Sequence, residues 1–260
     1  MRILITNDDG IDALGLRRLE EELKKDHDVF VCAPDREQSA SSHSLSLSRP
    51  LRLMSRGENR WACDGTPTDS VLLAFHELFK ETPPELIVSG INHGQNMGED
   101  VTYSGTIAAA IEGAILGAPS LAVSLIQNDD RTYAEESFSS VARFLSRFIE
   151  RYHTLNIPKS TFLNLNFPDL DGADYLSYQY TRLGSRVFND VVIHKTDPRG
   201  KSYYWIGGEA DWQDIGGTDY SATRRGLVSI TPLRVNFDDD ETLRKLGTDE
   251  VRTISGELRE

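Results

Sequence analysis

The chain has 260 residues, of which 38% are hydrophobic, so it is long enough to bury a core within one enlarged domain. Its formal net charge of −13 argues against polymeric nucleic acid as a partner, because proteins that bind a phosphate backbone need basic patches. There is no apolar signal stretch at the N-terminus and no run near the ~20 apolar residues of a membrane span, so we expect a cytoplasmic protein without a membrane partner.

The first part of the chain alternates predicted strands and helices. Residues 2–6 form an apolar run typical of a buried strand, and Leu16, Leu19 and Leu23 then recur at helical spacing. A second strand is predicted at 29–33, where Pro34 ends it. This order of elements predicts a βαβ unit.

The same alternation continues to about residue 167. We predict helices near 69–79, 107–115 and 138–149, and strands at 86–89 and 121–124. The fold class is therefore α/β, a doubly wound, Rossmann-like and mostly parallel sheet, in which the loops at the carboxyl ends of the strands form the site.

The composition changes after Pro168. From Tyr175 to Pro232 the chain is rich in aromatic residues, glycine and threonine, with short β-like runs at 202–206 and 228–231. Acidic residues at 238–241 then open a final short helix, where the helix dipole favours negative charge. We expect a β-rich extension that ends in a helix.

Two adjacent carboxylates, Asp8 and Asp9, follow the first predicted strand. They would repel each other unless a cation lies beside them, so they are candidate metal ligands and catalytic residues. An Asp-Asp-Gly sequence is also ordinary turn chemistry, so a cap or Asx-turn is an alternative. The pair alone does not decide between the two.

Three later loops carry oxygen-bearing side chains to the same predicted edge of the sheet. They contain Ser39, Asn92 and the stretch from Asn96 to Thr106. Carboxylate, hydroxyl and amide oxygens favour a hard ion, Mg²⁺, Mn²⁺ or Ca²⁺, over zinc. For Ser39, a place in a flexible serine-rich loop is the alternative.

The run Tyr103-Ser104-Gly105-Thr106 opens an apolar helix. Its hydroxyls and backbone N–H groups, with the helix dipole, form a natural phosphate cradle. A simple N-cap is the alternative, but the glycine-punctuated loop before it allows a ligand to approach the backbone closely. We nominate no histidine as catalytic.

Taken together, several ordered blocks closely resemble the SurE family of metal-dependent 5′(3′)-nucleotidases. They are NDDG at 7–10, APDREQSASS at 33–42, DGTPTDS at 64–70 and SGINHGQNMGEDVTYSGTIAAAIEG at 89–113. Later segments such as LNLNFPDL at 163–170 and TDYSATRRGLVSITPL at 218–233 are also similar to the family. Two positions depart from it: Leu14 stands where members often have proline, and Ala40 where many have glycine.

The resemblance assigns roles to the residues of the predicted site. It implies metal ligation of one divalent cation per subunit, Mg²⁺ or Mn²⁺ with Ca²⁺ as another occupant, by Asp8, Asp9, Ser39 and Asn92. It implies phosphate or substrate contacts at Asn96, Ser104, Gly105 and Thr106.

It also implies a single domain over 1–260, with a Rossmann-like catalytic core at 1–170 and a β-rich extension with a C-terminal helix at 171–260. Exchange of C-terminal segments would then build a homodimer or homotetramer.

Our hypothesis is a phosphomonoesterase that hydrolyses nucleoside 5′-monophosphates, with 3′-monophosphates as a further substrate class. Water activated by the cation attacks in line, and the cradle stabilises the phosphoryl oxygens. An aspartate nucleophile stays open as an alternative. From a different class, a nucleotide-sensing module without turnover is also compatible with the sequence.

Overall fold

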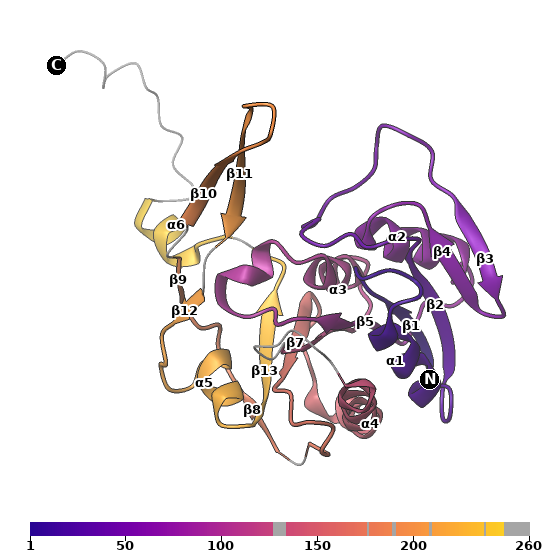
Figure 1. Cartoon of the computed structure of the whole chain (residues 1–260). Coiled ribbons are helices and arrows are strands. Elements are labelled where there is room, and N and C mark those ends of the chain that lie inside the picture. Colours follow the sequence, from indigo (N-terminus) through magenta and orange to yellow (C-terminus); the bar gives the residue numbers. More distant parts are fainter. Residues whose placement is uncertain (127–133, 176, 189–190, 208–209, 237, 247–260) are drawn as a thin grey trace.

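A computed structural model describes the chain except residues 127–133, 176, 189–190, 208–209, 237 and 247–260 (Figure 1). A nine-stranded sheet runs through the molecule. Its strands, in order across the sheet, are β3 (Leu53–Gly57), β4 (Arg60–Cys63), β2 (Asp28–Pro34), β1 (Arg2–Thr6), β5 (Leu86–His93), β6 (Ser120–Leu125), β7 (Thr161–Phe167), β13 (Val228–Arg234) and β8 (Tyr178–Tyr180). The six strands from β4 to β7 are parallel, and β13 then runs antiparallel to β7.

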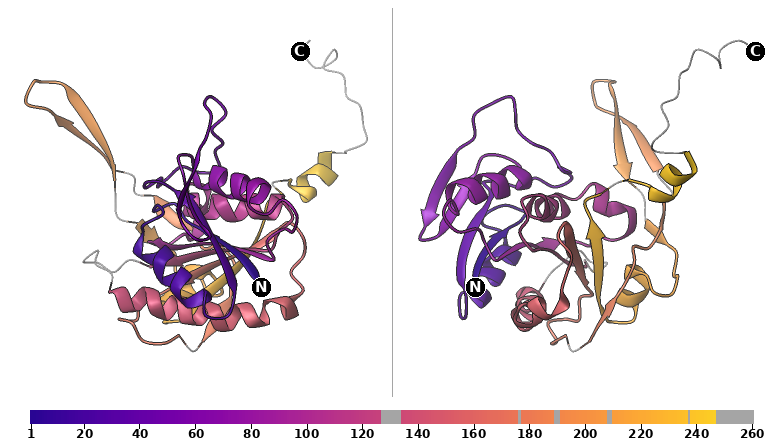
Figure 2. Two further views of the ribbon diagram at one scale, coloured as in Figure 1. Left: turned by 90° about the vertical axis from the view of Figure 1, so that its right-hand side faces the viewer. Right: turned by 180° about the vertical axis from the view of Figure 1, so that it is seen from behind.

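Helices cover both faces of this sheet. Helices α1 (Leu14–Leu23) and α4 (Glu135–Tyr152) contact each other on one face, and α2 (Pro67–Glu77) and α3 (Gly105–Ile115) contact each other on the opposite face (Figures 1 and 2). The fold is therefore the predicted doubly wound α/β sheet, with additional strands from the C-terminal part of the chain.

Strand β1 lies at the centre because its side chains serve both cores. Ile3 and Ile5 are fully buried in the cluster that includes the leucines of α1, whereas Leu4 belongs to the cluster under α2 and α3. Burial of each such side chain is worth about 1.5–3 kcal/mol. The end of β1, and the loop that follows it, are thus fixed from two sides.

The chain leaves β1 in both directions across the sheet. Strand β2 lies on one side of β1 and β5 on the other, so the point between β1 and β5 is where the order of the strands reverses. In open α/β sheets ligands bind in the crevice at such a switch point. The loop after β1 and the loop after β5 both open there.

The C-terminal part of the chain is β-rich, as expected, but two of its strands, β13 and β8, enter the main sheet. In β13, Val228 and Ile230 are fully buried and join the core beside β7. The remaining elements are β9 (Arg186–Phe188) paired with β12 (Ala210–Trp212), a hairpin of β10 (Val191–Thr196) and β11 (Ser202–Gly207), and helices α5 (Asp219–Arg224) and α6 (Asp240–Leu246). Of the helices in the described part of the chain, none is both long and apolar enough to cross a membrane.

Gly15 sets how closely α1 approaches the sheet. A Cβ added at this position would lie 2.1 Å from the carbonyl oxygen of Ile91 in β5, and this backbone atom has little room to move. We expect Gly15→Ala to lower the free energy of unfolding by about 1–3 kcal/mol, the usual cost of overpacking. Urea denaturation measures the change.

Gly216→Ala is the matched control, since nothing lies within 4 Å of a Cβ at that glycine. The control should leave the urea midpoint nearly unchanged. If Gly15→Ala also left the urea midpoint unchanged, α1 would not pack against β5 as closely as the structure shows.

Candidate active site at the carboxyl edge of the sheet

Asp8 and Asp9 follow β1 at the switch point and are largely withdrawn from water. Burial raises the pKa of each to about 6; the charge of Asp9 adds to the effect on Asp8, and the charge of Glu37 adds to the effect on Asp9. Among the described residues, no lysine or arginine forms an ion pair with either carboxylate. The pair is therefore a concentration of negative charge without a cationic side chain to neutralise it.

The raised pKa values fix the direction of a pH effect. An acid whose pKa is higher in the folded than in the unfolded state contributes stability below its ordinary pKa, and that contribution disappears as pH rises through about 6. Without a cation, the two ionised carboxylates thus oppose folding near neutral pH. A bound divalent cation would remove this repulsion.

The N-terminus of α3 faces this pair. The Thr106 hydroxyl donates a hydrogen bond to Asp8 Oδ1, and a Cβ on Gly105 would lie 2.8 Å from Asp8 Cβ. Only glycine permits that approach. Ser104 caps the helix, because its Oγ accepts from the Ile107 N–H at 3.1 Å. The N-cap and the predicted phosphate cradle are thus the same residues, with the positive end of the helix dipole beside the carboxylates.

The loop after β2 closes another side of the site. The Gln38 N–H donates to the Asp8 carbonyl at 2.7 Å, and Ser42 donates from its N–H to the Tyr103 carbonyl at 3.1 Å. Ser39 itself is exposed, and its hydroxyl donates to Glu37 Oε1 at 2.8 Å. The structure therefore brings the loop of Ser39 to the pair, while its hydroxyl is directed to Glu37.

Ala40, in the same loop, has a φ of 58°, in the left-handed region that glycine adopts without strain. The resemblance noted from the sequence implied that glycine often stands here. The departure therefore places an alanine where the backbone prefers no side chain.

The end of β5 supplies a third side. Asn92 is partly buried, and its amide donates to the Gly94 carbonyl at 2.8 Å. The next residue, His93, reaches the pair directly: its N–H donates to Asp9 Oδ2 at 3.3 Å, and its Nδ1 lies 3.7 Å from Asp9 Oδ1. Burial lowers the pKa of His93.

Asn96 belongs to a buried network of amides rather than to the front of the cradle. Its side chain donates to Ser124 Oγ at 2.8 Å, its N–H donates to Asn166 Oδ1 at 2.8 Å, and its carbonyl accepts from Asn164. This network joins the loop after β5 to strands β6 and β7. Among the described contacts of Asn96, none is with Ser104, Gly105 or Thr106.

Three residues that the sequence did not single out lie at this site. Glu37 and His93 contact the proposed ligands, and Ser41 Oγ is buried without a hydrogen-bond partner, 2.8 Å from the Cβ position of Gly105. All three belong to segments already selected for Ser39 and Asn92. Glu37 could have been found from the sequence, because it is a carboxylate only two residues before the proposed ligand Ser39.

The donor set fits a hard divalent cation. Across the described ranges, no group of three or more His, Cys, Asp or Glu side chains could hold a metal. What this edge offers is two carboxylates with neutral oxygens around them, and the buried Asn7 Oδ1 beside the pair has no partner. Mg²⁺ and Mn²⁺ are commonly bound by few carboxylates, with other oxygens completing the shell.

The C-terminal segment holds the loop that leads into the cradle. Asp219, at the start of α5, is fully buried and accepts from the N–H groups of Gly98 at 3.0 Å, Gly184 at 2.8 Å and Tyr220 at 2.7 Å. Gly98 begins the short helix η1 (Gly98–Thr102), which runs into Ser104. The Asp219 carboxylate thus links α5 to Gly98, which is more than a hundred positions earlier in the sequence.

A second set of contacts supports the same loop. Glu99 accepts from the Arg186 N–H at 2.8 Å, and the Arg186 guanidinium lies 2.7 Å from Asp100 Oδ1. Hydrogen bonding from Arg186 and Ser185 lowers the pKa of Glu99. The β-rich extension therefore acts as a support for η1.

Comparisons with known proteins agree with these observations. The family model described as "Survival protein SurE" matches residues 3–190. The chain is 45% identical to the 5'-nucleotidase SurE of Pelobacter propionicus, over 95% of this chain and 99% of that protein. It is 44% identical to the 5'-nucleotidase SurE of Vibrio vulnificus, over 95% of each chain.

The fold is similar to the crystal structure of the SurE protein from Aquifex aeolicus. The TM-score is 0.83 at 36% identity, covering 95% of this chain and 98% of that one. The likeness therefore extends over both the sheet and the C-terminal segment.

Asp219 allows a direct test of the support for η1. In Asp219→Ala the N–H groups of Gly98 and Gly184 lose their acceptor, and an unsatisfied buried donor costs about 1–3 kcal/mol. We expect the amides of the segment 98–104 to exchange hydrogen about tenfold faster or more, while amides of β1 change less. Hydrogen–deuterium exchange with mass spectrometry gives this comparison.

Asp214→Ala is the control, because Asp214 is an exposed acid whose ion pair with Arg224 spans 3.5 Å. Equal exchange rates in Asp219→Ala and in the unaltered protein would contradict the supporting role of Asp219.

Proposed function

The chain belongs to the SurE family, and on that premise we propose that it is a 5′-nucleotidase, which hydrolyses nucleoside 5′-monophosphates to nucleoside and phosphate. The single observation that carries the proposal is the contact between the carboxylate pair and the N-terminus of α3, made by Thr106 on Asp8. A phosphate that binds at this helix end lies beside the residues that would hold a cation. Nucleoside 3′-monophosphates are a further substrate class within the proposal.

We assign the divalent cation to Asp8, Asp9, Ser39 and Asn92, with Mg²⁺ or Mn²⁺ as its identity. Asp8 and Asp9 supply the charge, Asn92 an amide oxygen, and Ser39 a hydroxyl that would have to turn from Glu37 toward the pair. When bound, such an ion polarises a phosphoryl oxygen and lowers the pKa of a water molecule.

The chain's own residues position the phosphate. Ser104, Gly105 and Thr106 present hydroxyls and backbone to the phosphoryl oxygens, and the helix dipole offsets the charge that develops on them. We place Asn96 behind this cradle, where its contacts with Ser124 and Asn166 hold the loop. This arrangement needs no covalent intermediate.

Asp9 is the residue on which the metal assignment can be tested. Asp9→Asn keeps the size of the side chain and removes one of the two charges. We expect phosphate release from nucleoside monophosphates to fall more than about 100-fold and Mn²⁺ binding to weaken in parallel. In the unaltered protein Mn²⁺ binding should strengthen as pH rises through about 6, because both carboxylates must lose their protons.

Phosphate assays with Mn²⁺, Mg²⁺ or chelator measure turnover, and calorimetry at pH 5 and pH 7.5 measures cation binding. Asp12→Asn, an exposed acid of the same loop, is the control. Full activity in Asp9→Asn would contradict the metal assignment and leave Asp8 and Asp9 as residues of an ordinary turn. Cation and nucleotide binding without any phosphate release would favour the nucleotide-sensing module.

We further propose one SurE-like domain over 1–260, with a catalytic core at 1–170 and an extension at 171–260 that joins subunits into a homodimer or homotetramer. The hairpin of β10 and β11 supports this, because it projects from the body of the molecule (Figures 1 and 2). Its Trp205 and Ile206 are 60% and 88% exposed, and an apolar surface of this kind is typical of an interface. The cytoplasmic location stays a prediction from the sequence.

Ile206→Lys tests whether the hairpin contacts a second copy. A charge at the centre of an apolar interface is unfavourable, so we expect the mass in solution to fall by half or more. Light scattering after gel filtration measures this mass. Leu47→Lys is the matched control, since Leu47 is also 88% exposed but lies outside the hairpin. An unchanged mass in Ile206→Lys would rule out this hairpin as the contact.

A further inference from the structure

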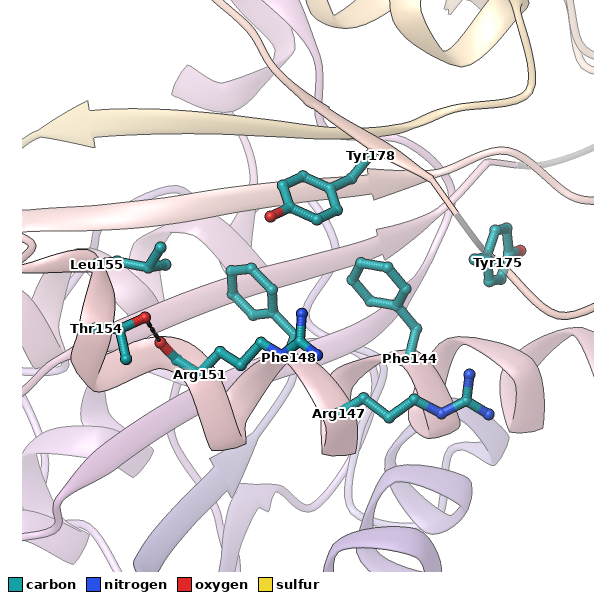
Figure 3. A pocket seen from close by; sticks show the side chains of 8 residues that line it. All are labelled: Phe144, Arg147, Phe148, Arg151, Thr154, Leu155, Tyr175 and Tyr178. Atoms are coloured by element: carbon teal, nitrogen blue, oxygen red, sulfur yellow. Dashed lines mark hydrogen bonds between the residues drawn. The ribbon is translucent and has the colours of Figure 1, made fainter.

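A cavity lies between α4 and β8, the last strand of the sheet, and the carboxylate pair is not among the residues that line it. Its volume is about 290 Å³, and the helix lines it with one face, on which residues recur at 144, 147, 148 and 151 (Figure 3). Thr154 and Leu155 of the short helix η2 (His153–Leu155), together with Tyr175 and Tyr178, form the other walls. The phosphatase reaction proposed above uses none of these residues.

Aromatic rings form the floor of this cavity. Phe144 and Phe148 are nearly parallel, with centroids 6.0 Å apart and 14° between their planes. The ring of Tyr178 crosses both at 81°, 6.2 Å from each, and Tyr175 stands edge-on to Phe144. A planar ring that binds between such side chains buries apolar surface and makes edge-to-face contacts with them.

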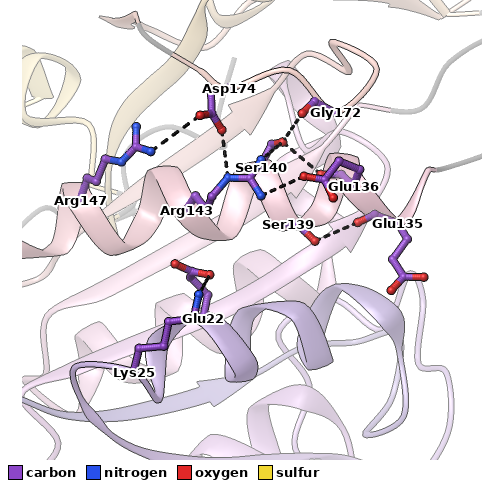
Figure 4. Close-up of polar contacts among 10 residues, drawn as sticks. All are labelled: Glu22, Lys25, Glu135, Glu136, Ser139, Ser140, Arg143, Arg147, Gly172 and Asp174. Carbon is purple, nitrogen blue, oxygen red and sulfur yellow. Dashed lines mark hydrogen bonds and ion pairs between the residues drawn. The ribbon is translucent and has the colours of Figure 1, made fainter.

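Two arginines, Arg147 and Arg151, stand at the mouth of the cavity on successive turns of α4. Both are exposed. Arg147 lies 3.8 Å from Asp174, but that carboxylate already makes a closer bond, 2.9 Å, with Arg143 (Figure 4). For Arg151, no carboxylate of the described residues lies within ion-pair distance.

The charge balance around the mouth is therefore positive. Arg143 is satisfied by Asp174 and by Glu136, both at 2.9 Å, so the two guanidinium groups beyond it share at most a distant contact with Asp174. Guanidinium groups favour phosphate and carboxylate oxygens, which they bind in a bidentate manner.

We propose that this cavity is a second ligand site, for a planar aromatic anion of the nucleotide class. The ring system lies against Phe144, Phe148 and Tyr178, and the phosphate lies on Arg147 and Arg151. A mononucleotide has both parts, and a cavity of this volume is close to the lower end of the size range of small-molecule sites. The site is independent of the hydrolytic centre, so the proposal stands or fails without the 5′-nucleotidase assignment.

Binding is best measured with a probe that cannot be hydrolysed. The phosphonate analogue of adenosine 5′-monophosphate, in which CH₂ replaces the bridging oxygen, is titrated into the full chain in chelator and followed by calorimetry. We expect Arg147→Gln with Arg151→Gln to weaken one binding event about tenfold or more, because each charge-assisted hydrogen bond is lost. Nucleotidase activity at saturating substrate should be unchanged in that double variant.

Matched control variants distinguish the contribution of the arginines to binding from that of the aromatic rings. Arg56→Gln removes an exposed charge on β3 and should have no effect on binding. Tyr178→Ala should weaken the same event, whereas Tyr203→Ala, which changes a similarly exposed ring on β11 outside the cavity, should not. Circular dichroism and the urea midpoint confirm that each variant is folded.

Three results would overturn the proposal. Binding of the phosphonate that the double variant leaves unchanged would place every binding event elsewhere. Inorganic phosphate that binds at Arg147 and Arg151 as tightly as the phosphonate would show that the rings take no part. A lower mass of the double variant in light scattering would identify the cavity as a contact between subunits instead.

Discussion

The site depends on one unfavourable interaction, the juxtaposition of two buried carboxylates at the end of the central strand. Asp8 and Asp9 cannot move apart, because the apolar side chains of β1 are fixed in the cores on both faces of the sheet. Burial raises their pKa values to about 6, aided by the charge of Asp9 on Asp8 and of Glu37 on Asp9, which leaves both ionised but destabilised near neutral pH. Binding of a positive charge beside the pair would therefore relieve the repulsion and stabilise the fold.

The partial positive charges around the pair also offset part of its negative charge. The Thr106 hydroxyl and the His93 N–H each donate to one of the carboxylates, and α3 directs the positive end of its dipole at them. These groups lower the pKa values only in part, since neither carries a full charge. What they do supply is orientation, because each comes from a different loop and fixes the direction of an oxygen.

The sequence predicted the sheet, its helices and most of the loops of the site because these rest on local patterns. Apolar runs ended by Asp, Gly or Pro mark the strands, and leucine spacing marks α1. The strands β3 and β4 were not predicted, since they are short and neither shows a clear alternation of apolar and polar residues. Contacts between distant segments were not predictable either: nothing near Asp219 in the sequence indicates that its carboxylate accepts from Gly98.

Ser104 and Asn96 show why a structural and a functional role need not exclude each other. Ser104 caps α3, which is the ordinary role of a serine at that position, and the same cap is what brings the helix N-terminus against Asp8. Asn96 fills its hydrogen bonds within the sheet, and by doing so it fixes the start of the loop that Asp219 holds from the other side. The cradle is thus rigid because the residues that build it are committed to the fold. A phosphate bound there, as proposed, would meet donors already in place, so the cost of ordering them would be met during folding rather than during binding.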